Sequence, residues 1–192
     1  MMETDIMVDS GMKLTCSRDE LVQRLGVVAR AVSTRTAVQI LAGVLLQAES
    51  GSLQLAATDM ELSLRSSLDA DVGGEGAVVV PGRLLVELTR LLPEQEVQIE
   101  HRAEEGVVRI DCGAATYRLN TYNAEDFPRL PDLASLATFS VDREALLDTV
   151  SRVARSASRD ESRPVLTGIL ARFEGGKLVM AGTSTGVNQV GN

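Results

Sequence analysis

The feature that constrains the fold most is an internal repeat. Residues 14–59 align with residues 139–184 without a gap, at a constant offset of 125 positions. The alignment preserves the apolar face of a helix, two turn glycines and the alternation of two strands at once. Such a match predicts a duplicated structural unit. Among the identical pairs are Arg18 with Arg143, Leu21 with Leu146, Gly43 with Gly168, Gly51 with Gly176 and Leu53 with Leu178.

Hydrophobic spacing along residues 12–122 alternates between a period of two, typical of strands, and a period near 3.6, typical of helices. It predicts a strand, a helix and three strands, and then the same order again. Apolar residues within 21–32 share one helical face, and Ser17 with Glu20 is expected to form a capping box at the helix start. The second copy is expected to hold a strand, a helix and two strands. The fold class is α+β, with helices on one face of antiparallel sheets.

The chain divides into five predicted segments. They are a disordered extension at 1–11, a complete first domain at 12–126, a proline-containing linker at 127–138, an incomplete second domain at 139–184 and an irregular tail at 185–192. The second domain lacks its partner unit of a strand, a helix and three strands, so it is expected to expose a strand edge and apolar surface.

Composition narrows the class of protein. Hydrophobic residues make up 44% and charged residues 24%, as in ordinary globular chains. No run approaches the roughly 18 apolar residues of a membrane helix, so no membrane partner is expected. The acidic start lacks the apolar core of a signal peptide, which favours a cytoplasmic location.

Charge is unevenly distributed between elements. The net charge is −8, which by itself argues against nucleic acid. The three expected helices with the loops that follow them hold eleven arginines against eight acidic residues, a net charge of +3, so the rest carries −11. At helical spacing, Gln23 and Arg30 point away from the buried face. This uneven distribution of charge predicts a basic helix face that can bind phosphates.

Candidate catalytic groups are few. His101 is the only histidine, and Cys16 and Cys112 lie in apolar stretches without a C-x-x-C pattern. We interpret both cysteines as small buried hydrophobes, in preference to a metal or redox site. Asp69 and Asp71 form one possible carboxylate pair, but a solvated turn explains them better. No enzyme activity, cofactor or metal is expected.

Several segments together resemble the bacterial sliding clamp, the beta subunit of DNA polymerase III. They are "KLTCSRDELVQRLGVVARAV", "VVVPGRLLVELTRLLP", "YRLNTYNAEDFPRLP" and "SRDESRPVLTGILARFEGGKLVMAGTS". The resemblance implies a DNA-clamp fold of tandem βαβββ units and a ring of two subunits with three similar domains each. Helices would line the central hole. It also implies a non-catalytic processivity factor that tethers the polymerase during DNA replication.

A ring that slides must hold duplex DNA through phosphates, because base contacts would fix its position. The resemblance therefore implies double-stranded DNA as a partner of the helix-face arginines. Arg35 matches an arginine that contacts DNA in the family, and Arg159 lies in the corresponding loop of the second copy. For any single arginine, a solvated helix face remains the alternative. The candidate DNA-binding residues are Arg30, Arg35, Arg83, Arg90, Arg152, Arg155 and Arg159.

The family also binds DNA polymerase III and the clamp loader through a pocket for a short peptide. Leu166 matches one wall of this pocket, and Thr183 begins the Thr-Asp-x-x-Arg-Leu stretch of which residues 184–188 keep nothing. The pocket is therefore expected to be incomplete.

Two functions follow from the resemblance. The first is a truncated sliding clamp, from a shortened or frameshifted gene or a fragment, unable to close a ring alone. The tail "GTSTGVNQVGN" favours a broken reading frame. The alternative is a regulatory or decoy short form that binds a full-length clamp and interferes with ring closure.

Overall fold

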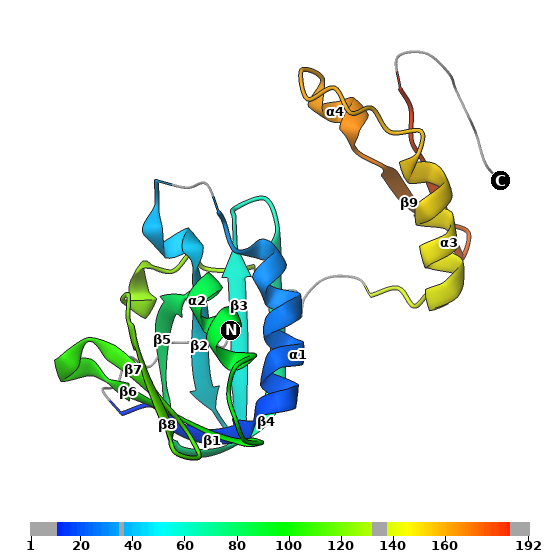
Figure 1. The fold of residues 1–192 in the computed structure, drawn as a ribbon. Coiled ribbons are helices and arrows are strands. Elements are labelled where there is room, and N and C mark those ends of the chain that lie inside the picture. The colour runs from blue at the N-terminus through cyan, green and yellow to red at the C-terminus, as the bar shows by residue number, and fades with distance from the viewer. Residues whose placement is uncertain (1–10, 35–36, 132–137, 185–192) are drawn as a thin grey trace. The chain divides into compact units, whose positions relative to one another are not determined.

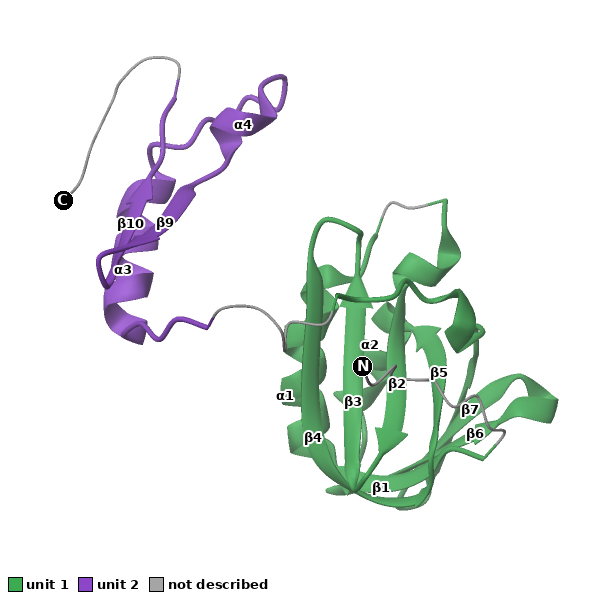
Figure 2. Cartoon of the chain, turned by 180° about the vertical axis from the view of Figure 1, so that it is seen from behind, with its two compact units in different colours: residues 1–131 green, residues 132–192 purple. Residues whose placement is uncertain are grey.

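The computed structural model describes residues 11–34, 37–131 and 138–184. The chain forms two compact units, unit 1 (1–131) and unit 2 (132–192), shown in different colours in Figure 2. Each unit is described by itself. Three segments predicted from the sequence fall wholly or partly outside the described residues. They are the disordered extension except for Gly11, the middle of the linker, and the tail.

Unit 1 confirms the predicted order of two strand–helix–three-strand halves (Figure 1). The first half comprises β1 (Lys13–Ser17), α1 (Arg18–Val28), β2 (Gly43–Glu49), β3 (Ser52–Thr58) and β4 (Ser63–Gly74). The second half comprises β5 (Gly76–Pro81), α2 (Gly82–Thr89), β6 (Glu96–Arg102), β7 (Val107–Cys112) and β8 (Ala115–Asn120). Short 3₁₀ helices are η1 (Ala29–Ala31), η2 (Gln39–Ala42), η3 (Ala103–Glu105) and η4 (Ala124–Asp126).

The eight strands form one antiparallel sheet, and both helices lie against the same face of it (Figures 1 and 2). The strand order is β5-β2-β3-β4-β1-β6-β7-β8. The two halves exchange their first strands, because β1 pairs with β6 and β5 pairs with β2. The two exchanges have matching registers, with Leu14 opposite Ile99 in one and Val78 opposite Leu46 in the other.

The core of unit 1 lies between the helices and the inner face of the sheet. Leu21, Leu25 and Val28 of α1 are fully buried, as the helical spacing predicts. Each buried leucine or valine side chain contributes roughly 1.5–3 kcal/mol. Cys16 and Cys112 are buried and free, which confirms their interpretation as small core residues. Burial, with a smaller contribution from the nearby Glu20 carboxylate, raises the pKa of Cys16 to about 12.

A smaller apolar cluster covers part of the outer face of the same sheet. Phe127 is buried there against Leu45 and Val79, and Leu130 packs beside them. Arg65 of β4 donates a hydrogen bond to the backbone carbonyl of Leu130 at 2.8 Å. The first residues of the segment that the sequence assigns to a linker are therefore packed on unit 1.

Unit 2 repeats the first part of unit 1. Its elements are α3 (Arg143–Ala154), α4 (Pro164–Thr167), β9 (Leu170–Glu174) and β10 (Lys177–Ala181). Ser33 donates its backbone N–H to the carbonyl of Leu41 at 2.9 Å, and the equivalent bond from Ser158 to Leu166 measures 2.8 Å. The β9–β10 register likewise equals that of β2–β3, shifted by the repeat offset.

Two local predictions are wrong. The second copy has no strand at residues 139–141, which align with β1. The β1 strand lies between β4 and β6, and the described part of unit 2 contains no counterpart of either. Ser17 makes no side-chain cap on α1: it ends β1 opposite Glu96, and the following N–H donates to Gln95.

Candidate nucleic-acid interface

The exposed side of α1 and η1 lies opposite the buried face of the helix. Gln23 and Arg30 are exposed, as the helical spacing predicts, and so is Arg24. Neither arginine forms an ion pair with any residue that the structure describes. An exposed arginine without a carboxylate partner contacts a phosphate without first breaking another interaction.

The α2 helix carries two arginines on its exposed side. Arg83 pairs with Glu87 one turn later at 2.9 Å, and its side chain is 85% exposed. The hydrogen bond from Arg83 to Glu87 raises the pKa of the arginine. Arg90 lies at the C-terminal end of α2, exposed and without an ion pair within the described ranges. The α1 and α2 helices pack against each other, so their arginines share one face of unit 1.

Unit 2 carries the remaining candidates on and after α3. Arg152 pairs with Asp148 at 2.6 Å, and Arg155 donates from Nε to the backbone carbonyl of Ser151 at 3.3 Å. Arg159 is exposed in the loop that follows. Arg152 and Arg155 lie at the C-terminal end of α3, where a cation is also favoured by the helix dipole. Their role at DNA therefore stays a prediction.

For three candidate residues the structure does not test the predicted site. Arg35 lies outside the described residues. Leu166 is half-buried in α4, and Thr183 is exposed directly after β10. The peptide pocket to which the resemblance assigns Leu166 and Thr183 stays a prediction as well.

Sequence reasoning singled out neither Arg18 nor Arg24, although both entered the charge count. Arg18 faces inward to unit 1: its Nη1 donates to the carbonyl of Leu92 at 3.1 Å. Arg24 is exposed without an ion pair among the described residues. Its helical phase is the signal that identifies it, since it lies outside the arc of Leu21, Leu25 and Val28.

Two arginines of the sheet, Arg102 and Arg118, are neutralised by acidic residues, unlike Arg24, Arg30 and Arg90. Arg102 pairs with Glu100 and Glu105, at 3.3 and 3.2 Å. Arg118 also reaches Glu105, at 3.6 Å. Exposed ion pairs of this kind contribute little stability, but they cancel the local charge. The unpaired positive charge of Arg24, Arg30 and Arg90 therefore contrasts with the neutralised Arg102 and Arg118.

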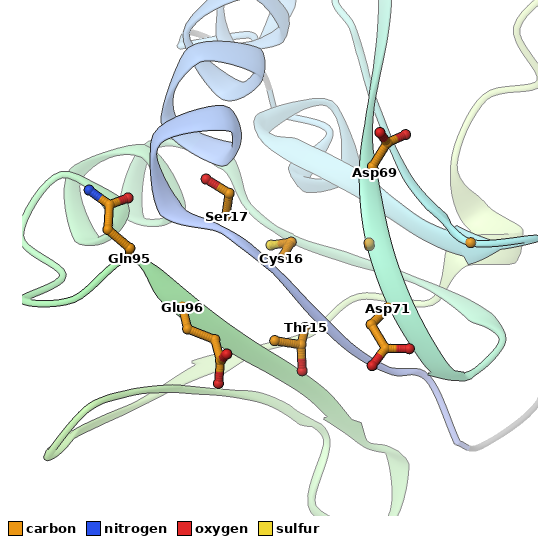
Figure 3. A pocket seen from close by; sticks show the side chains of 9 residues that line it. Thr15, Cys16, Ser17, Asp69, Asp71, Gln95 and Glu96 are labelled. Carbon is orange, nitrogen blue, oxygen red and sulfur yellow. The ribbon is translucent and has the colours of Figure 1, made fainter.

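A shallow depression on the sheet is acidic (Figure 3). Asp69 and Asp71 project from β4, and Glu96 projects from β6. All three carboxylates are exposed. The turn predicted at Asp69 and Asp71 is wrong, because both residues lie within β4 and pair with neighbouring strands. Negative charge repels phosphate, so this surface is unsuited to DNA. The helix face is the remaining candidate on unit 1.

Comparison with known proteins identifies the family. The family described as "DNA polymerase III beta subunit, N-terminal domain" matches residues 12–131 and 137–191. The chain belongs to this family. It is 38% identical to the beta sliding clamp of Streptomyces coelicolor over 90% of its own length, and 36% identical to that of Micrococcus luteus over 90%. It spans 45% of the first relative and 54% of the second.

Solved structures of the beta subunit share the fold. The sliding clamp of Bacillus subtilis superposes with a TM-score of 0.86 at 27% identity, over 91% of this chain and 48% of that one. The beta subunit of Pseudomonas aeruginosa superposes with a TM-score of 0.82 at 30% identity, over 91% and 47%. The sliding-clamp fold expected from the sequence is thereby confirmed. No helix among the described residues is long and apolar enough to cross a membrane.

Proposed function

We propose that this beta-subunit homologue is a non-catalytic DNA processivity factor that tethers DNA polymerase to duplex DNA in the bacterial cytoplasm. The observation that carries the proposal is the unpaired positive charge of Arg24, Arg30 and Arg90 on one face of unit 1. Binding is non-specific, because helix-face arginines attract phosphates without reading bases. The family implies DNA polymerase III and the clamp loader as protein partners, through a peptide pocket of which the sequence keeps only Leu166 and Thr183 and which is therefore expected to be incomplete.

Salt dependence of DNA binding tests this proposal. Binding of the 192-residue chain to a fluorescent duplex is measured by anisotropy between 20 and 200 mM salt. The logarithm of the association constant should fall linearly with the logarithm of salt concentration, by about 0.9 per phosphate contacted. Two duplexes of unrelated sequence should give the same affinity.

A triple variant locates the contact. Arg24→Ala, Arg30→Ala and Arg90→Ala together should lower the salt slope by about 2 to 3, since each arginine accounts for roughly one phosphate. Arg118→Ala, on the acidic sheet, is the matched control and should change neither slope nor affinity. Absence of binding at low salt, or an unchanged slope in the triple variant, would contradict the proposal.

A second function is favoured by the open surface of unit 2. In this alternative the 192-residue chain binds a full-length clamp and interferes with ring closure. Light scattering of the chain mixed with a full-length clamp from the same source tests it. A stable complex that lowers clamp loading supports the decoy role, and a mixture of two independent species argues against it.

A further inference from the structure

The two ends of the unit 1 sheet meet at a seam between β5 and the residues that follow β8. Within the described part of unit 1, a single backbone bridge joins them. Tyr122, two residues after β8, donates its N–H to the carbonyl of Val79 at 2.8 Å, and the N–H of Val79 donates to the carbonyl of Tyr122 at 3.3 Å. The seam therefore depends on the backbone of one residue pair.

The other half of unit 1 shows the same junction with a longer ladder. There β1 pairs with β4 at four consecutive positions, Lys13–Cys16, and Thr15 lies opposite Asp71. When the matching registers of the two halves are followed from strand to strand, Thr15 corresponds to Val79 and Asp71 to Tyr122. The bridge at the seam is thus the one pair that the second half keeps of this ladder.

After the seam the chain crosses the outer face of the sheet instead of continuing as a strand. We call residues 121–131 the strap. Phe127 of the strap is buried in a cluster with side chains of β5, β2 and β3. Beyond it, Arg65 of β4 donates to the carbonyl of Leu130 at 2.8 Å. The strap therefore passes over four neighbouring strands, in the order β5, β2, β3 and β4.

The contacts of the strap are separate from the main core of unit 1. Among the described residues, the core between the helices and the sheet contains none from the strap. The strap is held by the bridge of Tyr122, the burial of Ala124 and Phe127, and the hydrogen bond from Arg65. A segment with few buried contacts opens at a lower free energy than the whole domain.

We infer that the strap is a releasable connection that sets the point at which the chain leaves unit 1. When the strap is docked, this point is Leu130 on β4. When the strap leaves the sheet and the main core stays folded, the point moves back to Asn120 at the end of β8. The released residues 121–130 then lengthen the connection to unit 2 by up to about 30 Å, because an extended chain spans about 3.3 Å per residue.

Limited trypsin digestion of the full 192-residue chain measures the release. Arg129 is exposed, but its bond to Leu130 becomes a substrate only when this backbone leaves the sheet. Phe127→Ala should accelerate cleavage after Arg129 by at least about tenfold. Arg65→Ala, which removes no buried side chain, should accelerate it by about threefold to tenfold. Asp126→Ala, at an exposed position of η4, is the matched control and should leave the rate unchanged.

Cleavage after Arg109 reports unfolding of the sheet in the same samples, because β7 is paired on both sides. In Phe127→Ala and Arg65→Ala, the rate at Arg109 should rise far less than the rate at Arg129. Equal acceleration at both sites would overturn the inference, since the strap and the core would then unfold together. So would equal rates at Arg129 in the wild type and both variants.

Spin labels on Asp69→Cys of β4 and Lys177→Cys of β10 measure the consequence for unit 2. Both positions are exposed, and the native cysteines are buried. Adding Phe127→Ala should broaden the distribution of label distances towards longer values, whereas adding Asp126→Ala should not. An unchanged distribution despite faster cleavage after Arg129 would overturn the role of the strap in the connection. Neither measurement involves DNA, so the salt experiment tests the proposed function separately.

Discussion

Arg18 of α1 binds the backbone carbonyl of Leu92, 74 positions later in the chain, through its Nη1 at 3.1 Å. The same guanidinium pairs with Asp19 at 2.9 Å, and Gln95 donates to the other oxygen of that carboxylate. These hydrogen bonds, chiefly the one from Arg18, lower the pKa of Asp19. The start of α1 is thus joined to the segment that follows α2. This arginine therefore belongs to the fold, although it lies on the helix that carries the candidate Arg24.

Arg18→Ala should therefore lower the free energy of unfolding by about 1 kcal/mol, because it removes a charged donor from a partly buried carbonyl. It should leave the salt slope of DNA binding unchanged. Arg24→Ala is the matched control on the same helix and should show the opposite result, with unchanged stability and a shallower slope. Urea unfolding and anisotropy measure the two quantities. A loss of salt slope in Arg18→Ala would place this residue at DNA instead.

Glu87→Gln should strengthen DNA binding. Glu87 holds Arg83 at 2.9 Å on the exposed side of α2, so removing its charge frees the guanidinium and removes a repulsion of phosphate. The salt slope should steepen by up to about 0.9, which anisotropy titrations measure. Glu105→Gln releases Arg102 and Arg118 on the outer sheet and should have no such effect. Equal gains in both variants would mean that only net charge matters.

His101 should make stability depend on pH. Burial lowers its pKa in the folded protein below the ordinary 6.5, and its Nδ1 is buried without a hydrogen-bond partner among the described residues. The neutral ring is thus favoured in the folded state. The stability that the neutral His101 ring contributes is fully present above pH 6.5, the pKa in the unfolded chain. It is lost as the pH falls below 6.5 towards the lower pKa of the folded state. Urea unfolding of wild type and His101→Leu at pH 7.5 and pH 5.5 should show a smaller loss in the variant. Identical losses would contradict the prediction.

The repeat predicted more of the fold than any single motif did. A constant offset of 125 positions carries through to individual hydrogen bonds, such as those of Ser33 and Ser158 with their leucine partners. Helix phase was predictable for the same reason, since burial follows the spacing of Leu21, Leu25 and Val28. The internal repeat and the helix phase were therefore predictable from the sequence.

Features that depend on distant strands were not predictable. Ser17 has the sequence of a capping residue, yet pairing with Glu96 fixes its backbone in a strand. Asp142, its equivalent in the second copy, does cap, accepting from the N–H of Ala145 at 2.8 Å. Residues 139–141 form no strand because nothing in the described part of unit 2 pairs with them. Helical phase marks Arg24 as exposed, but the structural role of Arg18 depends on the Leu92 carbonyl, which belongs to a distant segment.

Gly82 permits the close contact between the start of α2 and the rest of the core. A Cβ atom at this position would lie 2.9 Å from Cγ2 of Val32 and 3.0 Å from Cγ2 of Val44, both on branched and confined side chains. Gly82→Ala should therefore cost about 1–3 kcal/mol of unfolding free energy through overpacking.

Gly26→Ala is the matched control inside α1, where a new Cβ would meet nothing within 4 Å. It should stabilise the protein by roughly 0.5–1 kcal/mol, because alanine loses less backbone entropy in a helix than glycine does. Urea unfolding of both variants measures whether each substitution lowers or raises the free energy of unfolding. If Gly82→Ala proved neutral, Val32 and Val44 would have room to move, and the start of α2 would pack more loosely against these two valines than the distances indicate.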